Sequence, residues 1–378
     1  MNPKIWLSAP HLGTSEEDFV KQVFADNWVA PVGPQLLEFE SAINNYLDAS
    51  TFTTALSSGT AAIHLALLLL EVAIGDEVLC QSFTFSATAN PITYLGATPV
   101  FIDSEPETWN MCPVILEEAI KDRIHKNKKP KAIIFVNLYG MPAKIDAILK
   151  VAETYGIPVI EDAAEALGSN YKSRRCGTFG HFSVFSFNGN KIITTSGGGA
   201  LISRTKAHHE RALFYATQAK ENALHYEHKH IGYNYRLSNV CAAIGLGQME
   251  VLSNRIAKRQ ENHQFYKEFF KDNTTISVFE APDHNYQSNY WLSCILIEPT
   301  AQFSVSDLVN YLAECHIEAR PLWKPLHLQP VFKPYPYYGG TICEKLFNNG
   351  ICLPSGSNLT DGDRLRIAAV LTDFLKNN

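Results

Sequence analysis

One lysine near the middle of the chain stands in unusual surroundings for a surface residue. Lys191 follows the aromatic run Phe185-Ser186-Phe187 and precedes a glycine triplet at 197–199. Upstream, an apolar segment ends on Glu161 and Asp162. A lysine amine can form a Schiff base with pyridoxal phosphate (PLP), and a carboxylate can hold the pyridine nitrogen of that cofactor protonated, so that the ring accepts electrons. The pair of Lys191 and Asp162 therefore suits PLP chemistry.

Asp162 also has a simpler interpretation, because an acid at the end of a strand often caps the helix that follows. Its spacing from Lys191, with a glycine-rich segment after the lysine, favours the cofactor role. The glycines at 197–199 are not a dinucleotide fingerprint, since they follow the lysine and lack the Gly-x-Gly-x-x-Gly spacing. We expect them to allow a close backbone approach next to the lysine.

A turn of small residues at 57–62 precedes the apolar segment 63–70. Such a turn at the start of a helix offers a phosphate free N–H groups and the positive end of the helix dipole. The alternative is an ordinary N-cap by Ser57 or Ser58. With a PLP lysine in the same chain, the phosphate cradle is favoured, and Ser186 is a candidate hydroxyl donor to the same phosphate.

The segment 81–90 follows a predicted strand, enters a helix and contains two phenylalanines. An aromatic ring at this place could stack on a planar cofactor. The simpler interpretation is that Phe83 and Phe85 are both ordinary core residues, and without further information it is the favoured one.

Between residues 75 and 203, short runs of branched residues alternate with segments of helical spacing such as 146–152. The predicted strands are 77–81, 98–103, 132–137, 158–161, 182–187 and 199–203. This alternation predicts an α/β fold with a mostly parallel central sheet covered by helices on both faces. Lys191 then lies on a connection at the edge of the sheet, where ligands gather in open α/β folds.

The last third of the chain has a different composition, which begins after a long helical stretch at 238–271. It contains a predicted strand at 290–297 and two predicted helices, 306–315 with Ser304 or Ser306 as its cap, and 360–375. We interpret it as a smaller C-terminal α+β domain. The predicted division is a large PLP-binding domain at 1–250, N-terminal arm included, and a small domain at 251–378.

Composition and charge limit the class of protein. The chain has 378 residues, 46% of them hydrophobic, and a formal net charge of −6. This charge argues against a nucleic-acid binder, and we expect the basic stretch 121–131 to be a solvated helix end and loop before a buried strand. The eight cysteines are scattered without a Cys-x-x-Cys pair, and the thirteen histidines show no metal-ligand constellation. We therefore predict no metal site.

The sequence indicates neither secretion nor a membrane. The N-terminal segment is too short and polar for a signal peptide. The longest apolar stretch, 61–75, is interrupted by His64 and Glu71 and is too short to span a bilayer, so it predicts a buried helix. We expect a cytoplasmic protein.

Several short motifs follow one another over nearly the whole chain. They are Ser58-Gly59-Thr60, Asp162-Ala163-Ala164, Gly177-x-x-Gly180, Phe185-Ser186-Phe187, Lys191 with Thr194-Thr195, 232–238, Arg320-Pro321-Leu322 and 352–356. In this order they resemble the DegT/DnrJ-type nucleotide-sugar aminotransferases. The resemblance implies the architecture of fold-type I PLP enzymes (the aspartate aminotransferase fold), with a large and a small domain.

The resemblance also assigns roles at the cofactor ring. By position, Lys191 is the residue that forms the Schiff base, Asp162 is the partner of the pyridine nitrogen, and Phe85 stacks on the ring. Glu165 stands near the ring at a position where many members have Gln or His, which leaves its role and charge state open.

The same resemblance implies an obligate homodimer whose subunits share their active sites. Gly59, Thr60 and Ser186 then hold the phosphate of PLP, and Asn234 reaches that phosphate from the other subunit.

The resemblance implies a transaminase that moves an amino group from an amino acid, L-glutamate by family analogy, to a nucleotide-linked keto sugar. The segment 188–195 is similar to that of members that aminate C4 of UDP-4-keto-6-deoxy-N-acetylglucosamine, on the path to bacillosamine-like sugars of glycans. We predict this reaction, in which the freed Lys191 amine moves the proton. The candidate sugar-nucleotide contacts are Trp28, Val29 and 323–327, where Lys324 or His327 could pair with the diphosphate or be an ordinary solvated loop residue.

Three alternatives remain open at this point. A C3 aminotransferase of a dTDP-linked keto sugar would use the same catalytic groups. A PLP-dependent sugar dehydratase is disfavoured, because relatives of that kind replace the lysine with histidine and this chain has Lys191. A PLP-binding regulator without turnover is the third, and the chain has no helix-turn-helix pattern or basic appendage to support a role on DNA.

Overall fold

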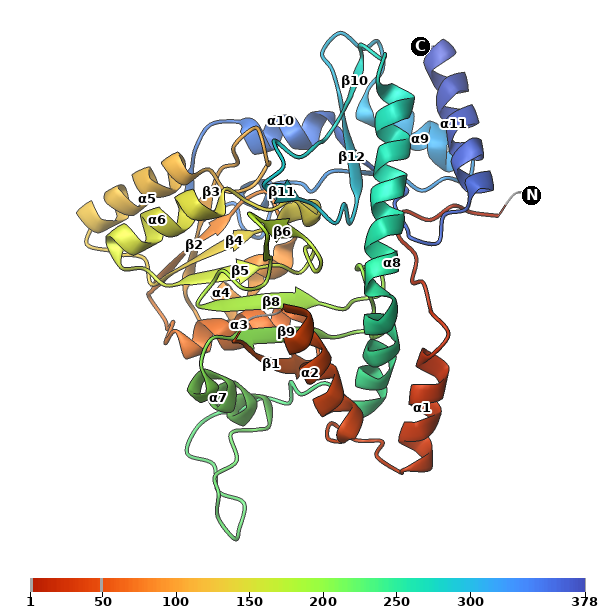
Figure 1. The fold of residues 1–378 in the computed structure, drawn as a ribbon. Helices are drawn as coiled ribbons and strands as arrows, with labels where there is room; N and C mark the ends of the chain where they lie inside the picture. Colours follow the sequence, from red (N-terminus) through yellow and green to blue (C-terminus); the bar gives the residue numbers. More distant parts are fainter. Residues whose placement is uncertain (1–2, 48–49, 378) are drawn as a thin grey trace.

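The apolar runs of the first half of the chain form one eight-stranded sheet. The computed structural model describes residues 3–47 and 50–377 (Figure 1). Strand β9 is antiparallel to both of its neighbours, and the other pairs in the sheet are parallel. In sheet order the strands are β1 (Phe52–Leu56), β9 (Gly199–Ser203), β8 (Phe182–Ser186), β5 (Val159–Asp162), β4 (Ala132–Val136), β2 (Glu77–Gln81), β3 (Thr98–Ile102) and β14 (Tyr337–Tyr338). The predicted α/β fold with a mostly parallel sheet is confirmed.

Helices cover both faces of this sheet because its strand residues are apolar on both sides. In β4, for example, Ile133 and Phe135 join one core cluster, while Ala132 and Ile134 join the other. The first cluster is covered by α2 (Pro34–Leu47), α5 (Pro113–His125), α6 (Ile145–Tyr155) and the start of α8 (Asn239–Phe270). The second is covered by α3 (Gly59–Leu69), α4 (Asn90–Tyr94) and α7 (Lys206–Ala216). The segment 61–75, predicted as a buried apolar helix, forms α3 only as far as Leu69, and Ile74 beyond it is exposed. The basic stretch 121–131 contains the end of α5 and the loop before β4 and is mostly solvated as predicted, except that Arg123 is buried in an ion pair with Glu77.

Helix α8 begins after Ser238, whose side chain accepts a hydrogen bond from the N–H of Cys241, and it continues for 32 residues. Figure 1 shows it running from the central sheet to a second sheet near the C-terminus, with α1 (Glu16–Ala25) packed beside it. The second sheet is antiparallel and has its own apolar core with α9 and α11. Its strands in order are β10 (Ile276–Val278), β12 (Ser293–Ile297), β15 (Gly350–Leu353) and β13 (Arg320–Pro321).

The remaining helices are α9 (Val305–Glu314), α10 (Ile342–Asn349) and α11 (Asp361–Lys376). Ser304 rather than Ser306 caps α9, in a capping box with Asp307. Strand β12 begins at Ser293, so the predicted start at residue 290 is wrong. The reason is local, because Tyr290 has a left-handed φ of 46° and the Asn289 side chain accepts the N–H of Trp291. Among the described residues, no helix is long and apolar enough to cross a membrane.

The predicted division at residue 250 falls inside α8, which runs across it without a break. Segments from the two predicted domains also pair with each other. Ile5 bridges Ile317, β14 pairs with β3, and β11 (Tyr286–Gln287) pairs with β6 (Asn170–Tyr171), which also pairs with β7 (Arg174–Arg175). The domain boundary therefore stays a prediction.

Two glycines of the triplet have different surroundings. A Cβ added to Gly199 would lie 2.4 Å from the amide nitrogen of Gly59 and 2.4 Å from the carbonyl carbon of Ser58. The close backbone approach expected of the triplet is thus made by Gly199 to the turn that begins α3. A Cβ added to Gly197 would meet no atom within 4 Å.

Gly199→Ala is expected to lower the free energy of unfolding by about 2 kcal/mol, because the added methyl group would overlap backbone atoms of α3. Gly197→Ala is the matched control and is expected to change it by no more than about 0.5 kcal/mol. Urea denaturation of both variants measures the difference. Equal losses in the two variants would contradict the close approach at Gly199.

Candidate active site

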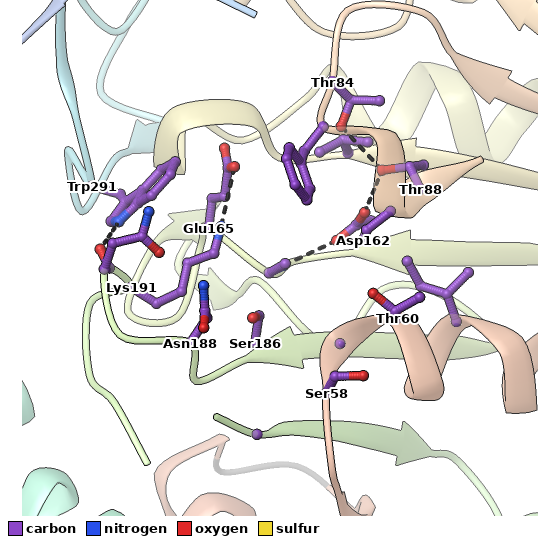
Figure 2. A pocket seen from close by; sticks show the side chains of 18 of the residues that line it. Ser58, Thr60, Thr84, Thr88, Asp162, Glu165, Ser186, Asn188, Lys191 and Trp291 are labelled. Carbon is purple, nitrogen blue, oxygen red and sulfur yellow. Dashed lines mark hydrogen bonds and ion pairs between the residues drawn. The ribbon is translucent and has the colours of Figure 1, made fainter. Parts of the chain in front are cut away.

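A cavity of about 250 Å³ opens at the carboxyl ends of β4, β5 and β8, beside the start of α3 (Figure 2). This is the edge of a parallel sheet where ligands bind in open α/β folds. All of the predicted site residues except Asn234 line it. They are Gly59, Thr60, Phe85, Asp162, Glu165, Ser186 and Lys191.

Lys191 lies on the connection between β8 and β9, and its side chain is 12% exposed. Its Nζ atom lies 3.2 Å from Oε1 of Glu165 and 4.0 Å from the ring centroid of Trp291. The indole Nε1 of Trp291 donates to the carbonyl oxygen of Asn190 at 2.7 Å, which ties the ring to the residue before the lysine. The ammonium group is therefore held between a carboxylate and an aromatic face.

Glu165 is buried just after β5. Its second oxygen, Oε2, accepts the N–H of Tyr139 at 2.7 Å, and Tyr139 presents that N–H from a left-handed backbone with φ of 55°. Burial raises the pKa of Glu165, and the negative charge of Asp162 adds to this rise. The positive charge of Lys191 and the hydrogen bond from the Tyr139 N–H oppose it. A carboxylate with a raised pKa beside an amine can exchange a proton with it.

Asp162 is buried at the opposite wall of the cavity (Figure 2). The hydroxyl of Thr88 donates to its Oδ2 at 2.7 Å, and the N–H of Ala164 donates to Oδ1 at 3.2 Å. Because Thr88 has one hydroxyl proton, the 3.0 Å contact between the hydroxyls of Thr84 and Thr88 must use the proton of Thr84. Burial raises the pKa of Asp162, and the Thr88 hydroxyl is the largest of the contacts that oppose the rise.

The start of α3 forms a third wall. The Ser58 side chain accepts the N–H of Ala61 at 3.0 Å, so the N-cap interpretation is right for Ser58. The N–H groups of Gly59 and Thr60 have no partner among the described residues. A Cβ on Gly59 would lie 3.2 Å from Cβ of Ser186, in the space where these groups converge.

The cavity walls fit PLP. An amine stands on one side, a buried carboxylate stands opposite, and hydroxyl and free N–H groups of a helix start lie below them (Figure 2). These are the groups that an aldehyde, a pyridine nitrogen and a phosphate require.

The two phenylalanines of the segment 81–90 have different environments. Phe83 is fully buried in the core, edge-on to Tyr139 with ring centroids 6.3 Å apart. Phe85 is 52% exposed, lines the cavity and lies 5.4 Å from the ring of Trp323. The core interpretation therefore applies to Phe83 and not to Phe85, because Phe85 follows the strand where the chain turns across the cavity. The stacking of Phe85 on the cofactor ring stays a prediction.

Other predicted residues lie outside the cavity lining. Asn234 is exposed, and its backbone bridges Thr217. The side chain of His327 makes contacts within its own chain. Its Nδ1 lies 2.7 Å from the Ser82 hydroxyl, and its ring stacks on Tyr337 with the ring centroids 3.8 Å apart. Lys324 is exposed, as are Trp28 and Val29.

Several lining residues were missed by the sequence reasoning. The main ones are Thr88, Trp291 and Asn188, whereas Trp323 belongs to the predicted contact segment 323–327 and does line the cavity. Thr88 had a weak signal, since it lies three positions after Phe85 in a segment already considered. Trp291 comes from a distant part of the chain and had none.

Comparison with known proteins gives a consistent picture. Residues 10–372 match the model of the DegT/DnrJ/EryC1/StrS aminotransferase family. EpsN of Bacillus subtilis (strain 168), a proposed pyridoxal phosphate-dependent aminotransferase, is 50% identical over 98% of this chain and 96% of its own length. GDP-perosamine synthase of Escherichia coli O157:H7 is 37% identical over 97% of each chain. The UDP-4-amino-4-deoxy-L-arabinose–oxoglutarate aminotransferase of Shewanella sediminis (strain HAW-EB3) is 31% identical over 98% of each chain.

Solved structures have the same fold. A proposed sugar aminotransferase, Spr1654 from Streptococcus pneumoniae in its PLP form, superimposes with a TM-score of 0.89 at 25% identity, covering 99% of each chain.

Thr88→Val is expected to cost about 2 kcal/mol of unfolding free energy at pH 7, because a buried ionised carboxylate loses its hydroxyl donor. The pKa of Asp162 is raised above its ordinary value of 3.8, so ionisation of this group costs stability as the pH rises through the folded-state pKa. Near the ordinary value the folded chain holds Asp162 protonated, and the expected loss falls to about 1 kcal/mol.

Urea denaturation at the two pH values measures this difference. Thr84→Val is the matched control, because it leaves the bond between Thr88 and Asp162 in place and its cost is expected to be nearly independent of pH. A Thr88→Val loss that is equal at both pH values would rule out the ionised carboxylate as the acceptor.

Proposed function

The chain belongs to the DegT/DnrJ/EryC1/StrS aminotransferase family, and we propose that it transfers an amino group from L-glutamate to C4 of a UDP-linked 4-keto-6-deoxy-N-acetylhexosamine. It is a PLP-dependent sugar aminotransferase, as the named relatives are aminotransferases of the same family. The observation that carries the proposal is the single cavity in which the Lys191 amine and the Asp162 carboxylate face each other.

We assign the groups around the cofactor as follows. Bound PLP supplies a ring that withdraws electrons from the carbon whose proton is moved. Lys191 holds the cofactor and, once its amine is free, carries that proton. Glu165 lies 3.2 Å from the amine and can balance its positive charge or accept a proton from it. Asp162, fixed by Thr88, keeps the pyridine nitrogen protonated. Phe85 covers the ring.

The phosphate is assigned to the start of α3. Gly59 and Thr60 offer free N–H groups there, and Ser186 faces the same space. The cavity lining contains no arginine, and its only lysine is Lys191, within the described residues. A doubly charged phosphate would therefore be held by hydrogen bonds and the helix dipole on the side formed by this chain.

Two observations support the choice of nucleotide and ring position. The segment 188–195 is similar to that of C4 aminotransferases of the UDP-linked sugar, and it lines the cavity with Asn188, Asn190 and Lys191. One relative is named for a UDP-4-amino sugar and for oxoglutarate, the keto acid left by glutamate. Another relative, at higher identity, is named for a GDP-linked product, so GDP sugars are the first competitors to test.

The reaction is tested by incubating the enzyme with UDP-4-keto-6-deoxy-N-acetylglucosamine and L-glutamate. We expect 2-oxoglutarate and a UDP-4-amino sugar in equal amounts, and a rate at least about 10³-fold higher than that of Lys191→Ala, since the variant lacks the group that holds the cofactor and moves the proton. A dTDP-linked 3-keto sugar and a GDP-linked 4-keto sugar serve as comparison substrates. Faster turnover of either one would replace the proposed substrate.

The homodimer with shared active sites is also a proposal, as is a location in the cytoplasm. The support for the shared sites is the position of Asn234, which is exposed and lies outside the cavity of its own chain. In a two-fold dimer, a residue outside its own site can enter the site of the other subunit.

Mixing two inactive variants tests the sharing. Asn234→Asp places a negative charge against the phosphate and is expected to be inactive, as is Lys191→Ala. After subunit exchange, the mixture is expected to regain activity, because one site of each mixed dimer then carries neither substitution. If the mixture stays as inactive as the separate variants, while co-purification of two differently tagged subunits shows that mixed dimers formed, Asn234 acts within its own subunit.

A further inference from the structure

Arg259 lies in the middle of α8 and is 1% exposed. Within the described residues it forms no ion pair with a carboxylate, which is unusual for a buried guanidinium. Burial and the neighbouring Arg255 lower the pKa of Arg259 to about 9, so it remains protonated at neutral pH. A buried positive charge without a counter-ion is costly. Arg259 lies next to the connection between β8 and β9 that carries Lys191, residues 187–198, which we call the lysine loop.

The guanidinium group joins four segments that are far apart in the sequence. One terminal nitrogen, Nη1, donates to the carbonyl oxygens of Trp291 at 2.5 Å and of Ser355 at 3.2 Å. The other, Nη2, donates to the hydroxyl of Ser8 at 3.0 Å and lies 3.5 Å from the carbonyl oxygen of Lys191.

These contacts converge on the residues around the lysine. The Ser8 hydroxyl donates its proton to the carbonyl of Asn190 at 2.7 Å, and the same carbonyl accepts the indole N–H of Trp291 at 2.7 Å. Arg259 thus holds the lysine loop directly through Lys191 and indirectly through Ser8 and Trp291.

The two ends of Lys191 are fixed by the same network. Its carbonyl faces Arg259, and its amine lies 4.0 Å from the ring of Trp291, whose own carbonyl is bound by Arg259. We propose that Arg259 is a positioning residue that holds the Lys191 amine over Trp291 and against Glu165, where the amine meets the cofactor. This inference rests on the proposed role of Lys191.

The planar fork of arginine suits this task. Its two terminal nitrogens diverge and reach acceptors on several segments at once, whereas a lysine offers one compact ammonium group. The carbonyl of Ser355 also accepts the Asn262 amide at 3.4 Å, whereas the carbonyls of Trp291 and Lys191 have no other donor within the described residues. The arrangement therefore uses both the charge and the shape of the guanidinium group.

Arg255, one turn earlier on α8, provides a matched control. It is 5% exposed, and like Arg259 it has an Nε–H without a partner within the described chain. Its terminal nitrogens lie 3.3 Å from Nε2 of His11 and 2.9 Å from the carbonyl of Leu12. It holds the N-terminal segment and contacts neither the lysine loop nor Trp291.

The experiment compares Arg259→Met, Arg259→Lys and Arg255→Met as full-length proteins stripped of PLP. The first readout is the rate at which added PLP reacts at Lys191, followed by absorbance and identified by borohydride reduction and peptide mass. The second is the single-turnover rate with L-glutamate at saturating PLP. The third is the Tm, which measures the general cost of removing a buried arginine.

We expect Arg259→Met to slow PLP attachment and the glutamate half-reaction by about 100-fold, the size of effect that a displacement of about 1 Å produces. Arg259→Lys is expected to recover part of the loss. Arg255→Met is expected to stay within about threefold of the wild type at a similar loss of Tm. If Arg259→Met does not fold, Ser8→Ala and Arg259→Lys carry the test, with an expected loss of about tenfold in each.

The failure of this inference differs from the failure of the proposed function. If the wild type attaches PLP at a residue other than Lys191, the proposed function fails. If the wild type attaches PLP at Lys191, but the Arg259 variants and Arg255→Met lose rate equally and in proportion to Tm, Arg259 has only a structural role and the inference is overturned.

Discussion

The site depends on the parallel pairing of β5 with β8. In this register Asp162 lies opposite Val184, and the N–H of Ala163 donates to the carbonyl of Val184. Both strands end at the same edge of the sheet, so the carboxylate at the end of β5 and the loop that follows β8 must meet there. A shift of one residue in this register would turn Asp162 away from the cavity and into the opposite core.

Burial shapes the chemistry of this edge. Asp162 and Glu165 are both desolvated, and burial raises both pKa values. Each is then supported differently. Asp162 accepts from a hydroxyl and an N–H within its own wall, whereas Glu165 contacts the lysine amine. Two carboxylates that follow the same strand therefore have different partners, and this difference suits one to a fixed charge and the other to proton exchange.

The sequence was sufficient for features that arise locally. The strand pattern identified every long strand of the parallel sheet between residues 75 and 203, and the motifs brought Lys191, Asp162 and the start of α3 to one site. It was not sufficient where a contact joins distant segments. Trp291 reaches the lysine only because its loop enters from the second sheet, and the split between Phe83 and Phe85 depends on which side of the turn faces the cavity. The role of Glu165 also depended on Tyr139, whose left-handed backbone no pattern indicated.

The unbroken length of α8 has a mechanical consequence. Its first turns pack on the central sheet through Ala242 and Leu252, and its last turns pack in the core of the second sheet through Tyr266 and Phe270. A continuous hydrogen-bonded helix resists sharp bending. Any tilt of the second sheet is therefore transmitted along α8, and Arg259 lies on this helix between the two cores. A displacement of one sheet relative to the other would pull on the backbone of Lys191 at the same time.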